Sequence, residues 1–361
     1  MTSNHPVTGA GRRRVAVLGA TGAVGQSFVR LLVDHPWFEL VEVAASERSA
    51  GKSYTEATRW IGGDPIPGII AAMPVHPCDA TRISADIVFS ALDSSVAGEV
   101  EAAFARAGKT VLTNAKNYRM ERDVPLVIAE VNPAHLDIIA DQRRNRGWPG
   151  AIVANGNCAA IVAALPLAPI HEQFGITKIV VMTMQAVSGA GYPGVPSLDI
   201  LGNVIPFIKD EEPKIEVEIQ KFLGDVEGGA IQSADFLVSA HANRVPVEHG
   251  HTICMSVALR TPATVEEIEH SIAEWRGAED ARALPSAPAR PLMLSHHPDQ
   301  PQPRRQVDTG KGMTVVVGRV RRDPIFDIKL VAMGHNVIRG AAGASVLNAE
   351  LMVRRGLLGA T

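Results

Sequence analysis

A buried-strand pattern that leads straight into three spaced glycines sets the tightest limit on how this chain folds. Residues 13–36 read RRVAVLGATGAVGQSFVRLLVDHP, with an apolar run at 15–18, glycines at 19, 22 and 25, and then apolar residues at helical spacing. Gly19 allows a tight turn, Gly22 lets a pyrophosphate approach the backbone, and Gly25 lets the helix pack closely on the strand. The segment therefore predicts a strand, turn and helix that hold a dinucleotide at the helix N-terminus, with a purely structural turn as the alternative.

The end of the second predicted strand indicates which dinucleotide is bound. FELVEVAAS at 38–46 runs into SERSAGK at 46–52. An NAD site usually places an acidic side chain here to hold the ribose hydroxyls, whereas Ser46, Arg48, Ser49 and Lys52 offer donors and positive charge. The pattern favours NADP, and Glu47 in the same turn is the one residue that argues for NAD.

Strand and helix patterns alternate through the first half of the chain. We expect strands at 85–93, from 109 onward and at 125–133 (PLVIAEVNP), and a helix over about 95–107. This alternation predicts a mostly parallel, doubly wound α/β sheet, and the length of 361 residues favours two domains in one chain.

Cys158 stands at the head of a predicted helix. The segment AIVANGNCAAIVAAL (151–165) reads as a strand, a Gly-Asn turn and an alanine-rich helix. A thiol at a helix N-terminus has its thiolate stabilised by the dipole and by free backbone N–H groups, which could also hold a developing oxyanion. Cysteine is equally common as a buried space-filling residue, so both interpretations stay open here. Cys78 and Cys254 lack this placement and are interpreted as structural thiols.

A second polar cluster follows in the other half of the chain. MTMQAVSGAGYPG (182–194) predicts a strand that enters a glycine-rich loop, and HANRVPVEHGHTICMSVAL (241–259) predicts a loop that leads into a long strand. A histidine beside a nucleophilic cysteine would act as general acid and base. His249 and His251 could instead form a metal pair, but no third ligand stands at a suitable spacing, so we expect no metal.

Composition excludes several classes of function. A formal net charge of −3 lacks the basic excess that nucleic acid or an anionic membrane would require. Three widely spaced cysteines argue against a disulfide framework and indicate a reducing cytoplasm. Residues 1–14 read as a loose tail rather than a signal peptide, and no apolar window is long enough to span a bilayer.

Taken together, these segments resemble the aspartate-semialdehyde dehydrogenase family, of the archaeal and fungal type. The likeness covers nearly the whole chain and is carried in order by GATGAVG, SERSAGK, NAKNYRMERDVPLVIAEVNP, GNC, QAVSGAGYPGVPSLDILGNVIPFI, EEPK, NRVPVEHGHT and DPIFDIKLVAMGHNVIRGAAGASVLNAEL. The resemblance implies a Rossmann NADP-binding domain at 1–157 and an α+β catalytic and dimerisation domain at 158–338 on a mixed or antiparallel sheet. A C-terminal helix at about 339–361 would pack back on the first domain, and the protein would form a homodimer or homotetramer.

The resemblance also implies roles for individual residues. Cys158 would be the nucleophile, His251 the acid and base, and Gln185 the residue that orients substrate near the thiol. Arg244 would clamp the substrate carboxylate and Glu211 the amino group, while Lys214, Arg119 and Asn157 would face the phosphate. The implied cofactor contacts are Gly19, Thr21, Gly22, Ala23, Val24, Gly25, Ser46, Arg48, Ser49, Ser188, Gly189 and Asn336.

The implied reaction is the reversible NADP-dependent reductive dephosphorylation of L-4-aspartyl phosphate to L-aspartate 4-semialdehyde through a cysteine thioester. The rival readings are a malonyl-CoA reductase, an N-acetyl-glutamyl-phosphate reductase and a catalytically silent NADP-binding regulator. Two departures stand beside the nucleophile, since the family usually reads Pro at position 156 and Ser or Thr at 159, where this chain has Gly156 and Ala159. The segment TICM also has Ile253 where the family leads us to expect an acidic residue. The proline-rich stretch 284–305 is expected to be an ordered surface loop.

Overall fold

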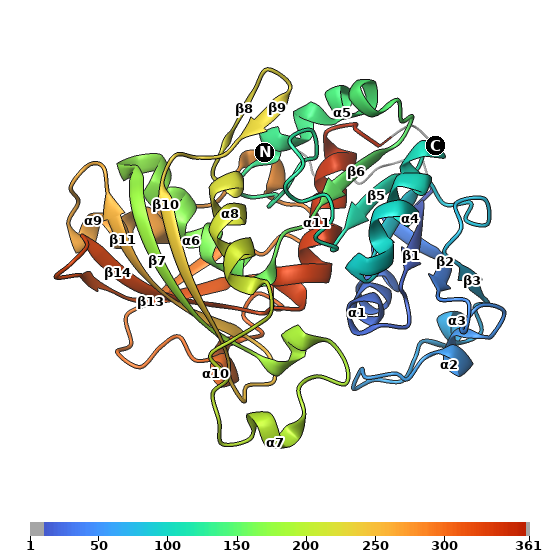
Figure 1. Cartoon of the computed structure of the whole chain (residues 1–361), viewed down its shortest axis with the longest axis horizontal. Coiled ribbons are helices and arrows are strands. Elements are labelled where there is room, and N and C mark those ends of the chain that lie inside the picture. Colours follow the sequence, from blue (N-terminus) through green and yellow to red (C-terminus); the bar gives the residue numbers. More distant parts are fainter. Residues whose placement is uncertain (1–10, 359–361) are drawn as a thin grey trace.

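The computed structural model describes residues 11–358, so most of the predicted tail and the last residues of the predicted C-terminal helix lie outside it. Over that range the chain builds two six-stranded sheets and one small hairpin, β8 (Asp225–Glu227) with β9 (Ala230–Gln232). Figure 1 shows the two sheets side by side, with the N-terminal half of the chain in one and the C-terminal half in the other. No helix within 11–358 combines the length and apolarity that a membrane span would need.

The first sheet is a parallel Rossmann sheet, as predicted. Its strands are β1 (Arg13–Leu18), β2 (Phe38–Ala45), β3 (Val75–Pro77), β4 (Ile87–Ser90), β5 (Thr110–Thr113) and β6 (Ala151–Ala154). They run in the order β3-β2-β1-β4-β5-β6, which is the dinucleotide-binding topology. Its helices are α1 (Ala23–Leu32), α2 (Tyr54–Ala57), α3 (Gly68–Ala71), α4 (Ser94–Arg106), η1 (Pro133–Ile138) and α5 (Ile139–Arg146).

The strand predicted at 125–133 is wrong. Only Leu126 makes a single bridge to Ala154, and the rest of the segment is a loop that ends where η1 begins at Pro133. Its apolar run is explained by burial, since Val127 and Ile128 are fully buried. The Asn132 side chain accepts from the N–H of Ile128 and donates to the carbonyl of Leu126, so a side chain satisfies backbone groups that a strand would have paired.

The second sheet is mixed, in agreement with the resemblance. Its strands are β7 (Ile176–Gln185), β10 (Leu237–Arg244), β11 (His251–Leu259), β12 (Leu292–Ser295), β13 (Val315–Arg322) and β14 (Ile328–Gly334), in the order β10-β7-β11-β14-β13-β12. The two outer pairs are parallel and the three inner pairs antiparallel. Helices α6 (Cys158–Phe174), α8 (Glu211–Phe222) and α9 (Val265–Glu274) contact these strands. The shorter elements are η2 (Val187–Ala190), α7 (Ser197–Ile200), η3 (Glu279–Ala281) and α10 (Pro303–Gln306).

The proline-rich stretch 284–305 is more than a surface loop. It contains β12, which pairs in parallel with β13 at the edge of the second sheet, and Leu292 is buried there. Prolines flank the strand rather than interrupt it, which is the arrangement that an edge strand tolerates. The prediction of a loop is therefore corrected at its centre.

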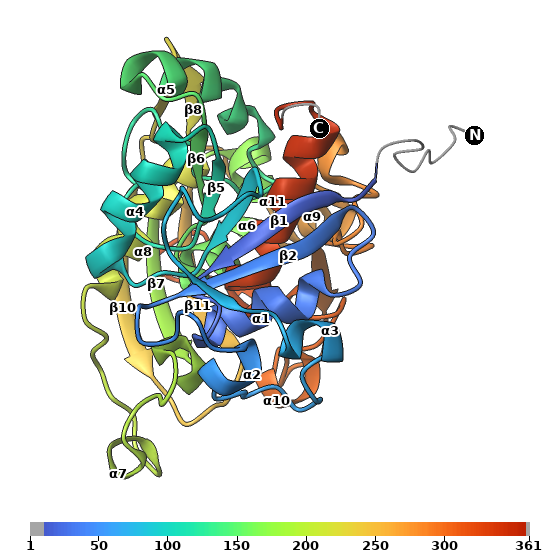
Figure 2. The ribbon, with the colours of Figure 1, turned by 90° about the vertical axis from the view of Figure 1, so that its right-hand side faces the viewer.

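The end of the described chain returns to the first sheet. A π-helical turn, η4 (Ile338–Ala342), leads into α11 (Gly343–Arg354), which contacts α1 and β5 (Figure 2). Val346 and Leu347 share a core cluster with Val15 and Phe28 of the first sheet. Because η4 also contacts α6, this turn lies where the two halves of the molecule meet.

Candidate active site

Cys158 is the first residue of α6, and residues 155–157 separate it from the end of β6. Asn157 caps the helix, and its Oδ1 accepts from the backbone N–H groups of Ala159 and Ala160 at 2.9 and 3.0 Å. These are the N–H groups expected to hold an oxyanion, and the cap already occupies them. In the free protein the cap therefore engages both donors, while the Ala159 N–H still lowers the pKa of the Cys158 thiol.

His251 contacts the thiol from the first residue of β11. Its Nε2 lies 3.1 Å from Cys158 Sγ, which brings together two residues 93 positions apart in the sequence. Cys158 packs against the backbone of η4, because a Cβ added to Gly340 would stand 2.5 Å from the Cys158 Cβ and 2.9 Å from its Cα. Glycine is therefore required at position 340 for the turn to approach the nucleophile.

A backbone group determines the tautomer of His251. The Ala186 N–H donates to His251 Nδ1 at 3.1 Å. In a neutral imidazole one nitrogen accepts and the other carries the proton, so an accepting Nδ1 leaves the proton on Nε2, facing the sulfur. The histidine is thus positioned as a hydrogen-bond donor toward Cys158.

Both partners are neutral in the free protein. Burial and the Glu211 carboxylate raise the pKa of the Cys158 thiol to about 12, against the opposing effect of Arg119, Arg244 and the Ala159 N–H. Burial, Arg244 and His335 lower the pKa of His251 to about 3. The resting pair is therefore thiol and imidazole rather than thiolate and imidazolium, because burial outweighs the helix terminus and the cations.

We expect the alkylation of Cys158 by iodoacetamide to show this ionisation. Below the pKa the thiolate fraction rises tenfold per pH unit, so the rate should climb about tenfold per unit from pH 7 to pH 9 without a plateau. Mass spectrometry of the modified peptide measures the rate and separates it from Cys78 and Cys254, which are also free. A plateau below pH 8 would mean a preformed ion pair.

The polar groups that are expected to face the substrate converge on Glu211, the first residue of α8. Its Oε1 accepts from Asn157 Nδ2 at 2.8 Å and from Gln185 Nε2 at 3.0 Å, and its Oε2 lies 3.5 Å from Lys214 Nζ. Gln185 ends β7, and the four side chains form a contiguous network beside the thiol. The structure thus brings together Gln185, Asn157, Glu211 and Lys214, as the resemblance implies.

Arg244 ends β10 and lies under the glycine-rich loop. Its Nη1 donates to the Ala186 carbonyl at 2.7 Å, and the side chain is buried. Gly189 makes this approach possible, since a Cβ there would stand 2.8 Å from Arg244 Nη1 and 3.1 Å from His251 Cε1. The guanidinium keeps unused donors for a carboxylate, which it can bind bidentately.

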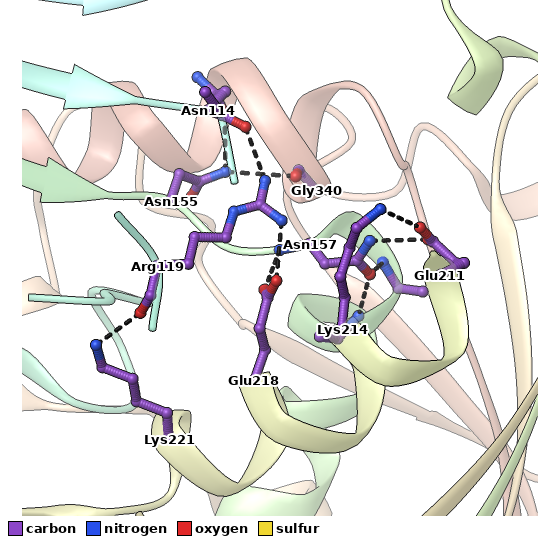
Figure 3. A network of polar contacts seen from close by, with 12 residues as sticks. Asn114, Arg119, Asn155, Asn157, Glu211, Lys214, Glu218, Lys221 and Gly340 are labelled. Atoms are coloured by element: carbon purple, nitrogen blue, oxygen red, sulfur yellow. Dashed lines mark hydrogen bonds and ion pairs between the residues drawn. The ribbon is translucent and has the colours of Figure 1, made fainter. Parts of the chain in front are cut away.

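Arg119 is buried rather than an exposed surface cation. Its Nη1 donates to Glu218 Oε1 at 3.0 Å and its Nη2 to the Asn114 carbonyl at 2.7 Å (Figure 3). Glu218 was not predicted from the sequence, although it repeats the helical spacing of Glu211 and Lys214 along α8. The Ala186 N–H and Gly340 were also missed, because neither has a functional side chain to give a signal.

The glycine-rich turn after β1 is shaped for a phosphate group. Gly19 has φ of +70°, and a Cβ there would meet the Ala91 carbonyl oxygen at 2.6 Å, while a Cβ at Gly25 would meet the Gly19 oxygen at 2.1 Å. Thr21 lies in this turn, Gly22 is the N-cap of α1, and Ala23 and Val24 begin the helix. Gly22 offers no side-chain cap, so the first N–H groups of α1 are available to a pyrophosphate.

The remaining predicted cofactor residues lie at two places. Ser46 and Arg48 are exposed and Ser49 is half-buried in the turn after β2. Ser188 Oγ accepts from Asn336 Nδ2 at 2.8 Å and contacts His249 Nδ1 at 2.9 Å. Ser188 lies in η2, His249 just before β11 and Asn336 just after β14. Ser188 and His249 line a cleft of about 360 Å³ that Ala23 of α1 and the loops of the second domain enclose. Gly189, exposed in the adjoining loop, lies against Arg244 and His251.

His249 and His251 do not converge. His249 contacts Ser188 and stacks on His335, with ring centroids 4.9 Å apart, whereas His251 faces Cys158. Within residues 11–358 no group of three His, Cys, Asp or Glu side chains is arranged to hold a metal ion.

Comparison with known proteins matches this architecture. The family model for the semialdehyde dehydrogenase NAD-binding domain covers residues 14–139, and that for the semialdehyde dehydrogenase dimerisation domain covers 167–339. An aspartate-semialdehyde dehydrogenase of Archaeoglobus fulgidus is 49% identical over 96% of this chain and 100% of its own, and one of Schizosaccharomyces pombe is 46% identical over 96% and 99%. The crystal structure of aspartate-semialdehyde dehydrogenase with NADP from Candida albicans is 41% identical, covers 96% of this chain and 100% of that chain, and superposes with a TM-score of 0.88.

Proposed function

The chain belongs to the aspartate-semialdehyde dehydrogenase family, and from this premise we propose how its residues divide the work of that reaction. It is an NADP-dependent oxidoreductase that interconverts L-4-aspartyl phosphate and L-aspartate 4-semialdehyde. The single observation that carries the proposed roles is the contact of Cys158 Sγ with His251 Nε2 at 3.1 Å, beside the polar network of Glu211.

Cys158 is the proposed nucleophile. Its sulfur bonds to the acyl carbon of aspartyl phosphate, the carbon–oxygen bond to the phosphate breaks, and phosphate departs with the proton that the thiol gives up. A thioester accepts hydride far more readily than a carboxylate, which is the chemical reason for the covalent step. Bound NADPH supplies that hydride.

His251 is the proposed hydrogen-bond donor in each step. Its Nε2–H stabilises the sulfur as it loses its proton, then the oxyanion that forms when the thioester carbonyl is reduced. When the carbon–sulfur bond breaks, the aldehyde leaves and the same N–H stabilises the returning thiolate, which then takes up a proton from solvent to restore the thiol. This proposal departs from the general acid and base role that the resemblance implies, since the ring would donate a hydrogen bond without gaining or losing a proton.

The other side chains position the substrate. We assign Arg244 to the α-carboxylate, Glu211 to the amino group and Gln185 to the reacting acyl group. Lys214, Arg119 and Asn157 are assigned to the phosphate. A coenzyme A thioester needs neither an amino-group partner nor a phosphate site, and the malonyl-CoA alternative is not favoured by the relatives either.

NADP reduction followed at 340 nm with aspartate semialdehyde tests the proposed function. We expect NADPH to form only when inorganic phosphate is present, with a phosphate-free buffer as the control. If no NADPH formed with phosphate present, while iodoacetamide still alkylated Cys158, the substrate assignment would be rejected. The assignment of Cys158 as a reactive thiol would be retained.

Arg48 is proposed to hold the 2′-phosphate of NADP from the exposed turn after β2. We expect Arg48→Ala to raise the KM for NADP by about ten- to a hundredfold, as loss of a charge-assisted hydrogen bond would, and to change the KM for NAD by less than about twofold. Steady-state kinetics with both dinucleotides measure this. Equal losses for the two would remove Arg48 from the phosphate contact.

We also propose several features of the protein as a whole. The domain boundaries are placed at residues 157 and 338, with the last helix joined to the first domain. A homodimer or homotetramer would form through the second sheet, where Met182 and Leu237 are 46% and 68% exposed, and inorganic phosphate would be the second substrate in the oxidative direction. A cytoplasmic location is supported by the three free thiols of the described chain. The aldehyde would serve the synthesis of lysine, methionine and threonine.

A further inference from the structure

One face of α8 reaches both the phosphate-site arginine and the nucleophile. Glu211 and Lys214 on its first turn belong to the substrate network described above. Glu218 and Lys221 continue the same row at helical spacing and are buried, at 1% and 2% exposure. Burial of two charged side chains requires specific partners, and Arg119 is a partner of both (Figure 3).

Glu218 uses its two carboxylate oxygens for two different parts of the site. Oε1 accepts from Arg119 Nη1 at 3.0 Å. Oε2 accepts from the backbone N–H of Asn157, the residue that caps α6 immediately before Cys158. One carboxylate thus connects a proposed phosphate ligand with the start of the nucleophile helix.

Lys221 holds the backbone of the same arginine. Its Nζ donates to the carbonyl oxygens of Arg119, Glu121 and Val124 at 2.6, 2.7 and 3.0 Å. The guanidinium and the main chain of Arg119 are therefore both fixed by α8, one turn apart. Arg119 lies in a loop without regular secondary structure, so it is these contacts that hold its backbone in place.

The contacts of Arg119 leave it able to bind an anion. A guanidinium has five N–H donors, of which Nη1 and Nη2 use one each on Glu218 and the Asn114 carbonyl. Its buried Nε has no partner in the described structure. A buried arginine whose fork is aimed by a carboxylate and whose further donors are unused is suited to a phosphate.

We propose that Glu218 is a positioning residue for the phosphate step, aligning Arg119 for phosphate and fixing the cap of the helix that carries Cys158. The proposal rests on the proposed function, since it assigns Glu218 to a phosphate site that the reaction requires. The local sequence fits this arrangement: a Cβ at Gly156 would stand 3.0 Å from Glu218 Oε2 and 2.2 Å from Phe222. A proline at 156, as the family usually has, would need α8 to sit differently against the cap.

Glu218→Gln tests the role of the carboxylate. The variant keeps the volume but removes the charge and one acceptor, so we expect the KM for phosphate to rise about tenfold or more, with the KM for NADP changed less than about twofold. Inorganic phosphate should also protect Cys158 from iodoacetamide less well in this variant. This protection measures phosphate binding in the absence of turnover. Should this variant fail to fold, Glu218→Asp, which withdraws the carboxylate by one methylene group, carries the same test.

Glu216→Gln is the matched control. Glu216 lies on the same helix and its carboxylate also accepts a backbone N–H, that of Ala240 on β10, away from the site. We expect its kinetics to match the parent protein. In an Arg119→Ala background, Glu218→Gln should raise the phosphate KM by less than it does in the parent protein, because only the contact with the Asn157 N–H is then left to disturb.

The outcomes separate the two proposals. If the parent protein shows phosphate-dependent activity and Glu218→Gln leaves the phosphate KM unchanged, the positioning role is overturned. Glu218 and Arg119 would then form a purely structural ion pair, even if the variant melted at a lower temperature. No phosphate-dependent activity in the parent would instead reject the proposed function. A raised phosphate KM that persists undiminished in the Arg119→Ala background would also count against action through Arg119.

Discussion

Replacing Cys158 with alanine is expected to lower kcat by at least about 10⁴-fold while the fold and NADP binding persist. The sulfur is the only group of this side chain within reach of the acyl carbon, and no other described cysteine stands beside His251. The change removes one atom next to Gly340, so the backbone of η4 has no new contact to avoid. Steady-state assays in both directions measure kcat, and quenching of protein fluorescence by NADPH measures binding.

Cys254→Ala is the control for the loss of a thiol. Cys254 is partly buried on β11 and pairs in register with Met182 and Val331, away from the nucleophile. Its replacement should leave kcat within about twofold, since nothing in the site contacts it. Substantial turnover by Cys158→Ala would reject the covalent mechanism, whereas loss of NADPH binding would show that the variant is misfolded.

Most of the first domain could be predicted from the sequence because its signals are local. The glycines at 19, 22 and 25 lie within one strand–turn–helix unit, and the structure gives each a steric or capping reason. The segment 125–133 was mispredicted because its apolar run has the composition of a strand, while its backbone is held by the side chain of Asn132. Such side-chain contacts are not visible in a hydrophobic pattern.

The active site could be predicted only in part. The capping residue and the thiol are adjacent in the chain, so the local sequence identifies Cys158 as a candidate nucleophile. The same local sequence is equally compatible with a buried structural thiol. Contact with His251 depends on the register of β11 against β14 and β7, which residue spacing does not give. The resemblance supplied the pairing, and the structure supplied what neither source named: the Ala186 N–H and Glu218.

The tautomer of His251 predicts that its alanine, glutamine and asparagine variants differ in kcat. If the ring acts by donating from Nε2, His251→Ala should lower kcat by about 10²- to 10⁴-fold in both directions. His251→Gln should recover part of this loss, because its longer amide can donate toward the sulfur. His251→Asn should not, since its shorter amide reaches the Ala186 N–H but places no donor near Sγ.

A base would give a different pattern. A histidine that must accept the thiol proton cannot be replaced by any amide, so glutamine and asparagine would then be equally inactive. The pH profile gives an independent test: burial and Arg244 lower the pKa of His251 to about 3, so between pH 6 and pH 9 the ring stays neutral and should contribute no step to the kcat profile. His270→Gln, an exposed position on α9, serves as the control. A step near pH 6.5 that disappears in His251→Gln but persists in His270→Gln would show that the ring does titrate during turnover, and the donor role would have to be abandoned.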